Sequence, residues 1–224
     1  MKHKILIVLL LLGIMKSNGF SYAAESKKSL KILAMGDSTT AGTPGFRSSA
    51  EEPPDGAGDE KSQYAYWMMQ RHPEWRVINR GIAGQRSDEI LPRLEEDLET
   101  FKPDVTVLLA GVNDVYQGYS ADTVKSNLKK MYTLASKNGR KLVVCTILPY
   151  NTADEIRQKR ILEINEWIRA QAKTHGFIFC DTFQALSSPD QPFHLTNSPD
   201  GVHPSIDDYK RMGAAIADAL EKGI

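Results

Sequence analysis

Five short apolar runs alternate with longer segments of helical period along most of the chain. The runs are rich in β-branched and aromatic residues, and those at 105–109 and 142–147 lack polar alternation. Runs of this kind are typical of parallel strands that are covered on both faces of a sheet. The five predicted strands are Lys31–Met35, Trp75–Ile78, Val105–Leu109, Leu142–Ile147 and Phe177–Cys180.

Four longer segments repeat apolar residues at a spacing of three or four positions, which predicts amphipathic helices. Pro204 suits the start of the last of them, and Pro92 is expected to kink the first. The repeated strand–helix order predicts an α/β protein, a three-layer α/β/α sandwich around a five-stranded parallel sheet. The apolar positions of the four helices are Ile90, Leu94, Leu98 and Phe101; Val124, Leu128, Met131 and Ala135; Ile161, Ile164, Ile168 and Ala172; and Ile206, Tyr209, Met212, Ile216 and Leu220.

Residues 42–61 interrupt this order. The segment holds three prolines and five acidic residues and shows no periodicity. It is therefore expected to be a long polar surface loop that forms neither helix nor strand. Because it begins four residues after Ser38, a candidate nucleophile, we treat it as a possible lid.

The first 24 residues have the layout of a secretory signal peptide. A basic start is followed by the apolar run Ile5–Met15 and by small residues up to Ala24. The run is shorter than the roughly 20 apolar residues that a transmembrane helix needs. We expect cleavage, a secreted or periplasmic protein, and one domain over residues 25–224; an uncleaved anchor is the alternative.

Charge and cysteine content narrow the possible functions. The chain has 28 basic and 28 acidic residues, and this balance argues against a nucleic-acid-binding protein. Two cysteines, Cys145 and Cys180, are too few for a disulfide scaffold or a cysteine-rich zinc site. They end neighbouring predicted strands, where free buried thiols are expected and a disulfide is the alternative.

Polar residues and glycines gather where the predicted strands end, which is where α/β sheets bind their ligands. Ser38 follows the first strand in Gly36-Asp37-Ser38, Gly81 follows the second, and Asn113 follows the third. Asp200 and His203 lie three residues apart, just before the last helix. Each signal is weak alone, but together and in this order they predict one catalytic site.

These residue types are those that the cleavage of an ester requires. Ser38 is a nucleophile once His203 accepts its proton, and Asp200 can bind the other ring nitrogen and fix the tautomer. The side-chain amide of Asn113 and the backbone N–H groups of Ser38 and Gly81 are candidate donors of an oxyanion hole.

With these blocks the chain resembles the SGNH/GDSL hydrolase family, whose motif blocks are named for a Ser, a Gly, an Asn and a His. Ser38 matches the first block, Gly81 the second, Asn113 the third, and Asp200 with His203 the last. The resemblance implies a flavodoxin-like strand order and hydrolysis of carboxylic esters through an acyl-enzyme, without metal or cofactor.

The acidic segment at 42–61 favours a neutral substrate with a short acyl group, such as O-acetyl groups on carbohydrate, in a small molecule or a polysaccharide. A lysophospholipase or thioesterase for longer chains is the alternative. We expect neither a nucleic-acid partner nor stable membrane insertion after cleavage of the signal. Aromatic residues after the strands could stack on a sugar or merely cover the core: Tyr116, Tyr119, Tyr150 and Phe193.

Two non-enzymatic functions compete with this interpretation. The hydroxyl-rich stretch 38–43 is similar to the phosphate loop of an FMN-binding flavodoxin, although that function leaves Asn113, Asp200 and His203 unexplained. The second is a catalytically silent carbohydrate-binding protein on the same fold, which the intact set of candidate catalytic residues disfavours.

Overall fold

The computed structural model describes residues 29–224. The predicted signal peptide, residues 1–24, lies outside this range. Among the described helices, none has the length and apolar character that crossing a membrane requires.

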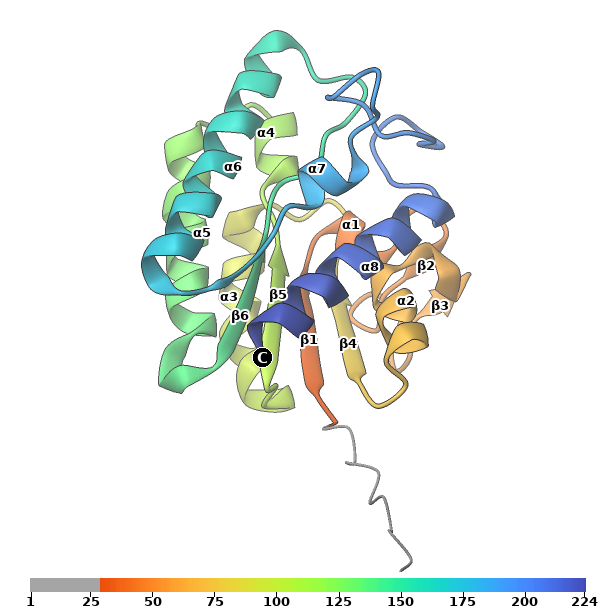
Figure 1. The fold of residues 1–224 in the computed structure, drawn as a ribbon, viewed down its shortest axis with the longest axis vertical. Helices are drawn as coiled ribbons and strands as arrows, with labels where there is room; N and C mark the ends of the chain where they lie inside the picture. Colours follow the sequence, from red (N-terminus) through yellow and green to blue (C-terminus); the bar gives the residue numbers. More distant parts are fainter. Residues whose placement is uncertain (1–28) are drawn as a thin grey trace, which may run out of the picture.

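A five-stranded parallel sheet forms the centre of the molecule (Figure 1). Its strand order is β4-β1-β5-β6-β7, the flavodoxin-like order that the resemblance implied. The chain therefore turns in opposite directions after β1 and after β5, and this change creates a crevice at the carboxyl ends of the strands. The strands are β1 (Lys31–Gly36), β4 (Arg76–Gly81), β5 (Val105–Leu109), β6 (Lys141–Cys145) and β7 (Ile178–Cys180).

Helices cover both faces of the sheet, which confirms the three-layer sandwich. One apolar cluster joins the sheet to α3 (Ser87–Phe101), α5 (Ala121–Ala135) and α6 (Glu155–His175). The other joins it to α2 (Tyr64–Arg71) and α8 (Ile206–Gly223), which lie on the opposite side in Figure 1. The short elements of the connections include α4 (Val112–Tyr116), α7 (Thr182–Leu186), η1 (Glu60–Ser62) and η2 (Lys137–Gly139).

The apolar runs supply both layers because successive side chains of a strand point to opposite faces. In β1, Leu33 and Met35 belong to the cluster with α3 and α5, whereas Ile32 and Ala34 belong to the cluster with α2 and α8. All four are fully buried, so the run needs no polar alternation. In the same way the neighbouring strand ends Cys145 and Cys180 are buried, and both are free thiols, as expected.

The structure differs from the sequence-based expectation at residues 42–61. This segment contains a two-stranded antiparallel sheet, β2 (Phe46–Arg47) with β3 (Ala57–Gly58), so the expectation of no strand is wrong. Phe46 is buried, and the Ser48 hydroxyl, also buried, donates to the Gly81 carbonyl oxygen. A single aromatic residue and a few side-chain hydrogen bonds therefore anchor a segment whose composition is that of a solvated loop.

Candidate active site

Ser38 is the first residue of α1 (Ser38–Ala41), the short helix that begins where β1 ends. Asp37 is its N-cap: the side chain accepts hydrogen bonds from the Thr39 backbone N–H at 3.0 Å and from the Thr39 hydroxyl at 2.8 Å. Because Ser38 is at the first helical position, its N–H has no acceptor within the helix. The strand-to-helix turn thus presents both the hydroxyl and the N–H of Ser38 at the carboxyl edge of the sheet.

His203 and Asp200 share one tight loop before α8. Asp200 Oδ1 accepts from the backbone N–H groups of Val202 at 2.9 Å and His203 at 2.8 Å, which fixes the carboxylate relative to the backbone. The Ser198 hydroxyl donates to the His203 carbonyl oxygen at 2.6 Å. The Asn151 N–H donates to the Gly201 carbonyl oxygen at 2.7 Å and ties the loop to the segment after β6.

The fold brings Ser38, His203 and Asp200 into one chain of contacts. His203 Nε2 lies 2.9 Å from Ser38 Oγ, and His203 Nδ1 lies 2.6 Å from Asp200 Oδ2. Ser38 and His203 are separated by 165 positions in the sequence, so only the fold creates this arrangement. The imidazole bridges a hydroxyl and a carboxylate, as the sequence predicted.

Asn113 lies in the first turn of α4, after β5, and borders the same cavity as Ser38. Its Nδ2 donates to the backbone carbonyl oxygen of Gln85 at 2.9 Å. A side-chain amide has two N–H groups, so this bond leaves the second one for another acceptor.

The structure does not bring Gly81 to the site. Gly81 is the last residue of β4, and its N–H donates to Asn79 Oδ1 at 3.0 Å. A Cβ at this position would lie 2.1 Å from the backbone nitrogen of Ala41, so the glycine is required where β4 packs against α1. The sequence-based assignment of Gly81 to the oxyanion hole is therefore wrong.

Gly84 lies where Gly81 was expected, on the border of the cavity. It follows β4 in a turn with φ of +78°, a conformation that favours glycine, and a Cβ there would meet no atom within 4 Å. Within the described chain its N–H has no hydrogen-bond partner. Gly84 thus offers the free backbone donor that Gly81 lacks.

The cavity beside Ser38 has a volume of about 330 Å³. Of the four aromatic residues considered from the sequence, only Tyr116 borders it; Tyr150 is buried beneath Tyr116. Thr43 is the one residue of 42–61 on its border. The cavity is lined by Ser38, Thr43, Ala83, Gly84, Val112, Asn113, Tyr116, Asp200, Val202 and His203.

A larger hollow of about 540 Å³ lies at the opposite, amino-terminal ends of the strands. Leu30, Asp104 and Lys141 border it, together with His72 and Trp75. None of the described residues on its border is a serine or cysteine, so it lacks a nucleophile of the kind that Ser38 provides. The chemistry therefore places the candidate active site in the smaller cavity.

The carboxylates around Ser38 have opposite electrostatic environments. Burial alone would raise the pKa of Asp200, but hydrogen bonds from the His203 ring and from the His203 and Val202 N–H groups outweigh it and bring the pKa to about 2. Asp200 is therefore ionised at every pH at which an imidazole is neutral. Burial raises the pKa of Asp37 to about 6, opposed by the hydrogen bonds from Thr39.

The raised pKa of Asp37 predicts a pH-dependent stability. The pKa is about 6 in the folded protein and 3.8 ordinarily, so the folded state holds the proton more tightly. Stability should fall as the pH rises from about 4 to 6, by up to about 3 kcal/mol. Asp37→Asn keeps an acceptor for Thr39 and cannot ionise, so its Tm relative to the wild type should rise over this range.

Thermal unfolding of both proteins between pH 4 and 8 measures this difference. Asp122→Asn is the matched control, because the Asp122 side chain is 95% exposed and its loss should give no comparable trend. Parallel Tm curves for the wild type and Asp37→Asn would contradict the prediction.

Comparison with known proteins agrees with the geometry. The model of the GDSL-like Lipase/Acylhydrolase family matches residues 34–211, which include all the site residues described above. The chain belongs to this family, and it is a carboxylic ester hydrolase.

Three relatives illustrate the similarity. The chain is 26% identical to an arylesterase of Vibrio mimicus over 91% of its own length and 94% of the relative's. It is 33% identical to an acetylxylan esterase of Geobacillus stearothermophilus over 42% of the chain and 44% of the relative. A solved GDSL-like lipase from Bacteroides thetaiotaomicron superposes with a TM-score of 0.69 at 27% identity, covering 88% of this chain and 91% of the other.

The structure also gives a reason why the interpretation of residues 38–43 as the phosphate loop of an FMN-binding protein fails. Thr39 and Thr40 are buried in α1, and the Thr39 hydroxyl donates to Asp37 Oδ1. Thr40 Oγ1 lies 3.5 Å from the Tyr64 hydroxyl, which donates to it. These hydroxyls therefore contact protein groups and do not line a phosphate site.

Proposed function

We propose that this protein is an exported esterase that removes short acyl groups through an acyl-enzyme on Ser38. The observation that supports the proposal most is the pair of contacts made by His203, at 2.9 Å to Ser38 Oγ and 2.6 Å to Asp200 Oδ2. A serine hydroxyl becomes an effective nucleophile when a neutral imidazole accepts its proton and a carboxylate holds that imidazole in the required tautomer.

In the proposed mechanism Ser38 Oγ bonds to the ester carbonyl carbon while its proton passes to His203 Nε2. The C=O double bond becomes a C–O⁻ single bond. As the tetrahedral intermediate collapses, His203 gives the proton to the departing alcohol oxygen. A water molecule then attacks the acyl-enzyme with His203 again accepting a proton, and the acid leaves with Ser38 restored.

The oxyanion is proposed to accept hydrogen bonds from the Ser38 N–H, the Gly84 N–H and Asn113 Nδ2. The first two are backbone donors without an acceptor among residues 29–224, and Gln85 fixes the orientation of the third. Donors that are already in place stabilise the developing charge without reorganisation during the reaction.

The size and lining of the cavity support a short acyl group. Its volume of about 330 Å³ is at the lower end of the range of ligand sites, roughly 300–1,000 Å³. The triad itself takes up part of its border, and Val112, Val202 and Ala83 supply small apolar surfaces. The exposed ring of Tyr116 at the border suits stacking against a sugar or an aryl group.

The names of the relatives point the same way, because they include an arylesterase and an acetylxylan esterase. We therefore favour acetyl groups on carbohydrate, with small aryl esters as model substrates. A lysophospholipase or thioesterase that acts on longer chains is the second candidate.

An acyl-length series from acetyl to palmitoyl on one aryl leaving group, with acetylated xylan alongside, tests the substrate class. An apolar groove that bound the whole chain would raise kcat/KM about fourfold for each added methylene. We expect the opposite trend, with the highest kcat/KM from acetyl to butyryl and release of acetate from the xylan. A maximum at decanoyl or longer would overturn the short-acyl proposal and favour the second candidate.

Export is proposed on the pattern of residues 1–24 alone: a basic start, an apolar run and small residues before Glu25. A secreted or periplasmic location would give the enzyme access to polysaccharide outside the cytoplasm.

A further inference from the structure

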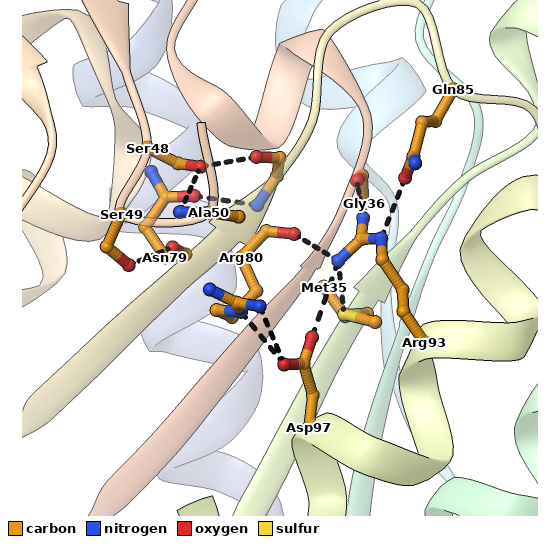
Figure 2. Close-up of polar contacts among 11 residues, drawn as sticks. Met35, Gly36, Ser48, Ser49, Ala50, Asn79, Arg80, Gln85, Arg93 and Asp97 are labelled. Carbon is orange, nitrogen blue, oxygen red and sulfur yellow. Dashed lines mark hydrogen bonds and ion pairs between the residues drawn. The ribbon is translucent and has the colours of Figure 1, made fainter. Parts of the chain in front are cut away.

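Arg93, on α3, reaches from its helix into the space between the carboxyl ends of β1 and β4 (Figure 2). Its side chain is only 14% exposed. The guanidinium donates to the Gly36 carbonyl oxygen at 2.8 Å, to the Arg80 carbonyl oxygen at 2.6 Å and to Gln85 Oε1 at 2.7 Å. One side chain thus joins the ends of two strands and the loop that follows β4.

Two of these acceptors, Gly36 and Gln85, are close to proposed oxyanion donors. Gly36 is two residues before Ser38, and its carbonyl oxygen also accepts the Ile82 N–H at 3.2 Å. Gln85 directly follows Gly84, and its backbone carbonyl oxygen holds Asn113 Nδ2 at 2.9 Å. The three donors come from three separate segments; Arg93 is bonded to residues near Ser38 and Gly84, and it is linked to Asn113 through Gln85.

Asp97 balances the charge of Arg93 from one turn further along α3. Its side chain is 5% exposed and accepts from Arg80 at 2.9 Å, while Arg93 Nη1 lies 3.4 Å away. Burial lowers the pKa of Arg93 to about 10, opposed by Asp97, so the guanidinium remains charged at neutral pH.

A lysine could not replace these contacts. The three acceptors lie in different directions, and the planar guanidinium presents five N–H donors in a fixed fork, whereas an ammonium is a compact group at the end of a flexible chain. The arrangement therefore depends on the shape of arginine as well as on its charge.

We infer that Arg93 is a positioning residue for ester hydrolysis, which aligns the Ser38, Gly84 and Asn113 donors by binding Gly36, Arg80 and Gln85. The inference rests on the proposed function, because it assigns a role to Arg93 through that oxyanion hole. Arg93 does not line the cavity and touches no substrate in this role.

Arg93→Lys tests the inference while keeping the charge. We expect kcat on an acetyl ester to fall roughly tenfold with little change in KM, because misaligned donors weaken transition-state binding more than ground-state binding. Arg140→Lys is the matched control: the half-buried Arg140 side chain donates to the Leu134 carbonyl oxygen at 3.0 Å and does not border the cavity. Its kcat should stay unchanged.

A reversible alkylboronic acid supplies a readout that loss of stability alone would not change. Boron accepts an electron pair from Ser38 Oγ as the hydroxyl proton moves to His203, which gives a tetrahedral adduct that uses the oxyanion hole. Its Kd should weaken by the same factor as kcat in Arg93→Lys, while inhibition by an unreactive alcohol stays the same.

Two further variants keep the test decisive. Gln85→Ala removes only the acceptor of Arg93 Nε, on a half-buried side chain, and it should lower kcat by a smaller factor than Arg93→Lys. This variant therefore tests the inference even where Arg93→Lys does not fold. Arg93→Lys combined with Asn113→Ala should cost less than the product of the single losses, because both changes act on one oxyanion hole.

Wild-type kcat and boronate affinity in Arg93→Lys, or a lowered Tm with unchanged kinetics, would overturn the inference. That result is distinguishable from failure of the proposed function. If Ser38→Ala and Asn113→Ala lose activity while Arg93→Lys does not, only the role of Arg93 is wrong; if Ser38→Ala stays active, the proposed acyl-enzyme itself is wrong.

Discussion

Replacing Ser38 with alanine should lower ester turnover by about 10³-fold or more, because no acyl-enzyme can form without the hydroxyl. Ser38 Oγ is the atom that His203 Nε2 contacts at 2.9 Å; the other hydroxyl-bearing residues that line the described cavity, Thr43 and Tyr116, form no hydrogen bond with His203. The change removes a single oxygen atom at the start of α1 and leaves the Asp37 cap in place. We therefore expect a folded protein with an unchanged Tm.

A fluorophosphonate probe checks the same prediction independently of the substrate. Its phosphorus bonds to a serine oxygen activated by a histidine and releases fluoride, so the wild type should carry one label and Ser38→Ala none. Ser49→Ala is the matched control, since its hydroxyl donates to the Asn79 carbonyl oxygen outside the cavity. Labelling that persists in Ser38→Ala would identify another nucleophile.

The sequence predicted the central sheet well because its strands are buried on both faces. The apolar run Val105–Leu109 coincides with β5, whose five residues are all buried. The helix α2 was not predicted, although Tyr64, Ala65 and Met68 have the spacing of a buried helical face. Because α2 closely follows the irregular segment 42–61, the helical spacing of these residues was not recognised.

An error in one strand boundary explains the wrong oxyanion glycine. The apolar run of β4 stops at Ile78, but the strand continues to Gly81 because it pairs with β1 up to Gly36. Asn79 contributes to this extension, since its amide nitrogen donates to the Ala41 carbonyl oxygen and to Gln63. The segment after the strand therefore begins three residues later than expected, at Ile82 rather than Asn79, and its turn contains Gly84.

The catalytic loop was easier to predict than the groups that support it. Asp200 and His203 are three residues apart, so one loop determines their contact. Arg93 lies 57 positions from Gly36 and 8 from Gln85, and nothing in its local sequence distinguishes it from a surface residue of an amphipathic helix. Interactions of this kind depend on the packing of α3 against the sheet.

Replacing Asn113 with alanine should lower kcat by about 10²–10³-fold, the usual effect of removing one oxyanion-hole donor. KM should change little, because the amide binds charge that develops only in the transition state. Asn127→Ala is the matched control: its amide donates to the Ser87 hydroxyl, away from the cavity, and its loss should leave kcat unchanged.

The same variant also tests how the site is divided between binding and catalysis. The Asn113 amide uses one N–H for Gln85, so only its second N–H is available to the oxyanion, and no group in the described part of the chain competes for it. Removing the side chain also frees the Gln85 carbonyl oxygen, which remains held in its loop because the Gln85 side chain is bonded to Arg93. The structural cost should therefore be small and the Tm close to that of the wild type. A rise in KM with an unchanged kcat would show that Asn113 binds the substrate in its ground state and would remove it from the oxyanion hole.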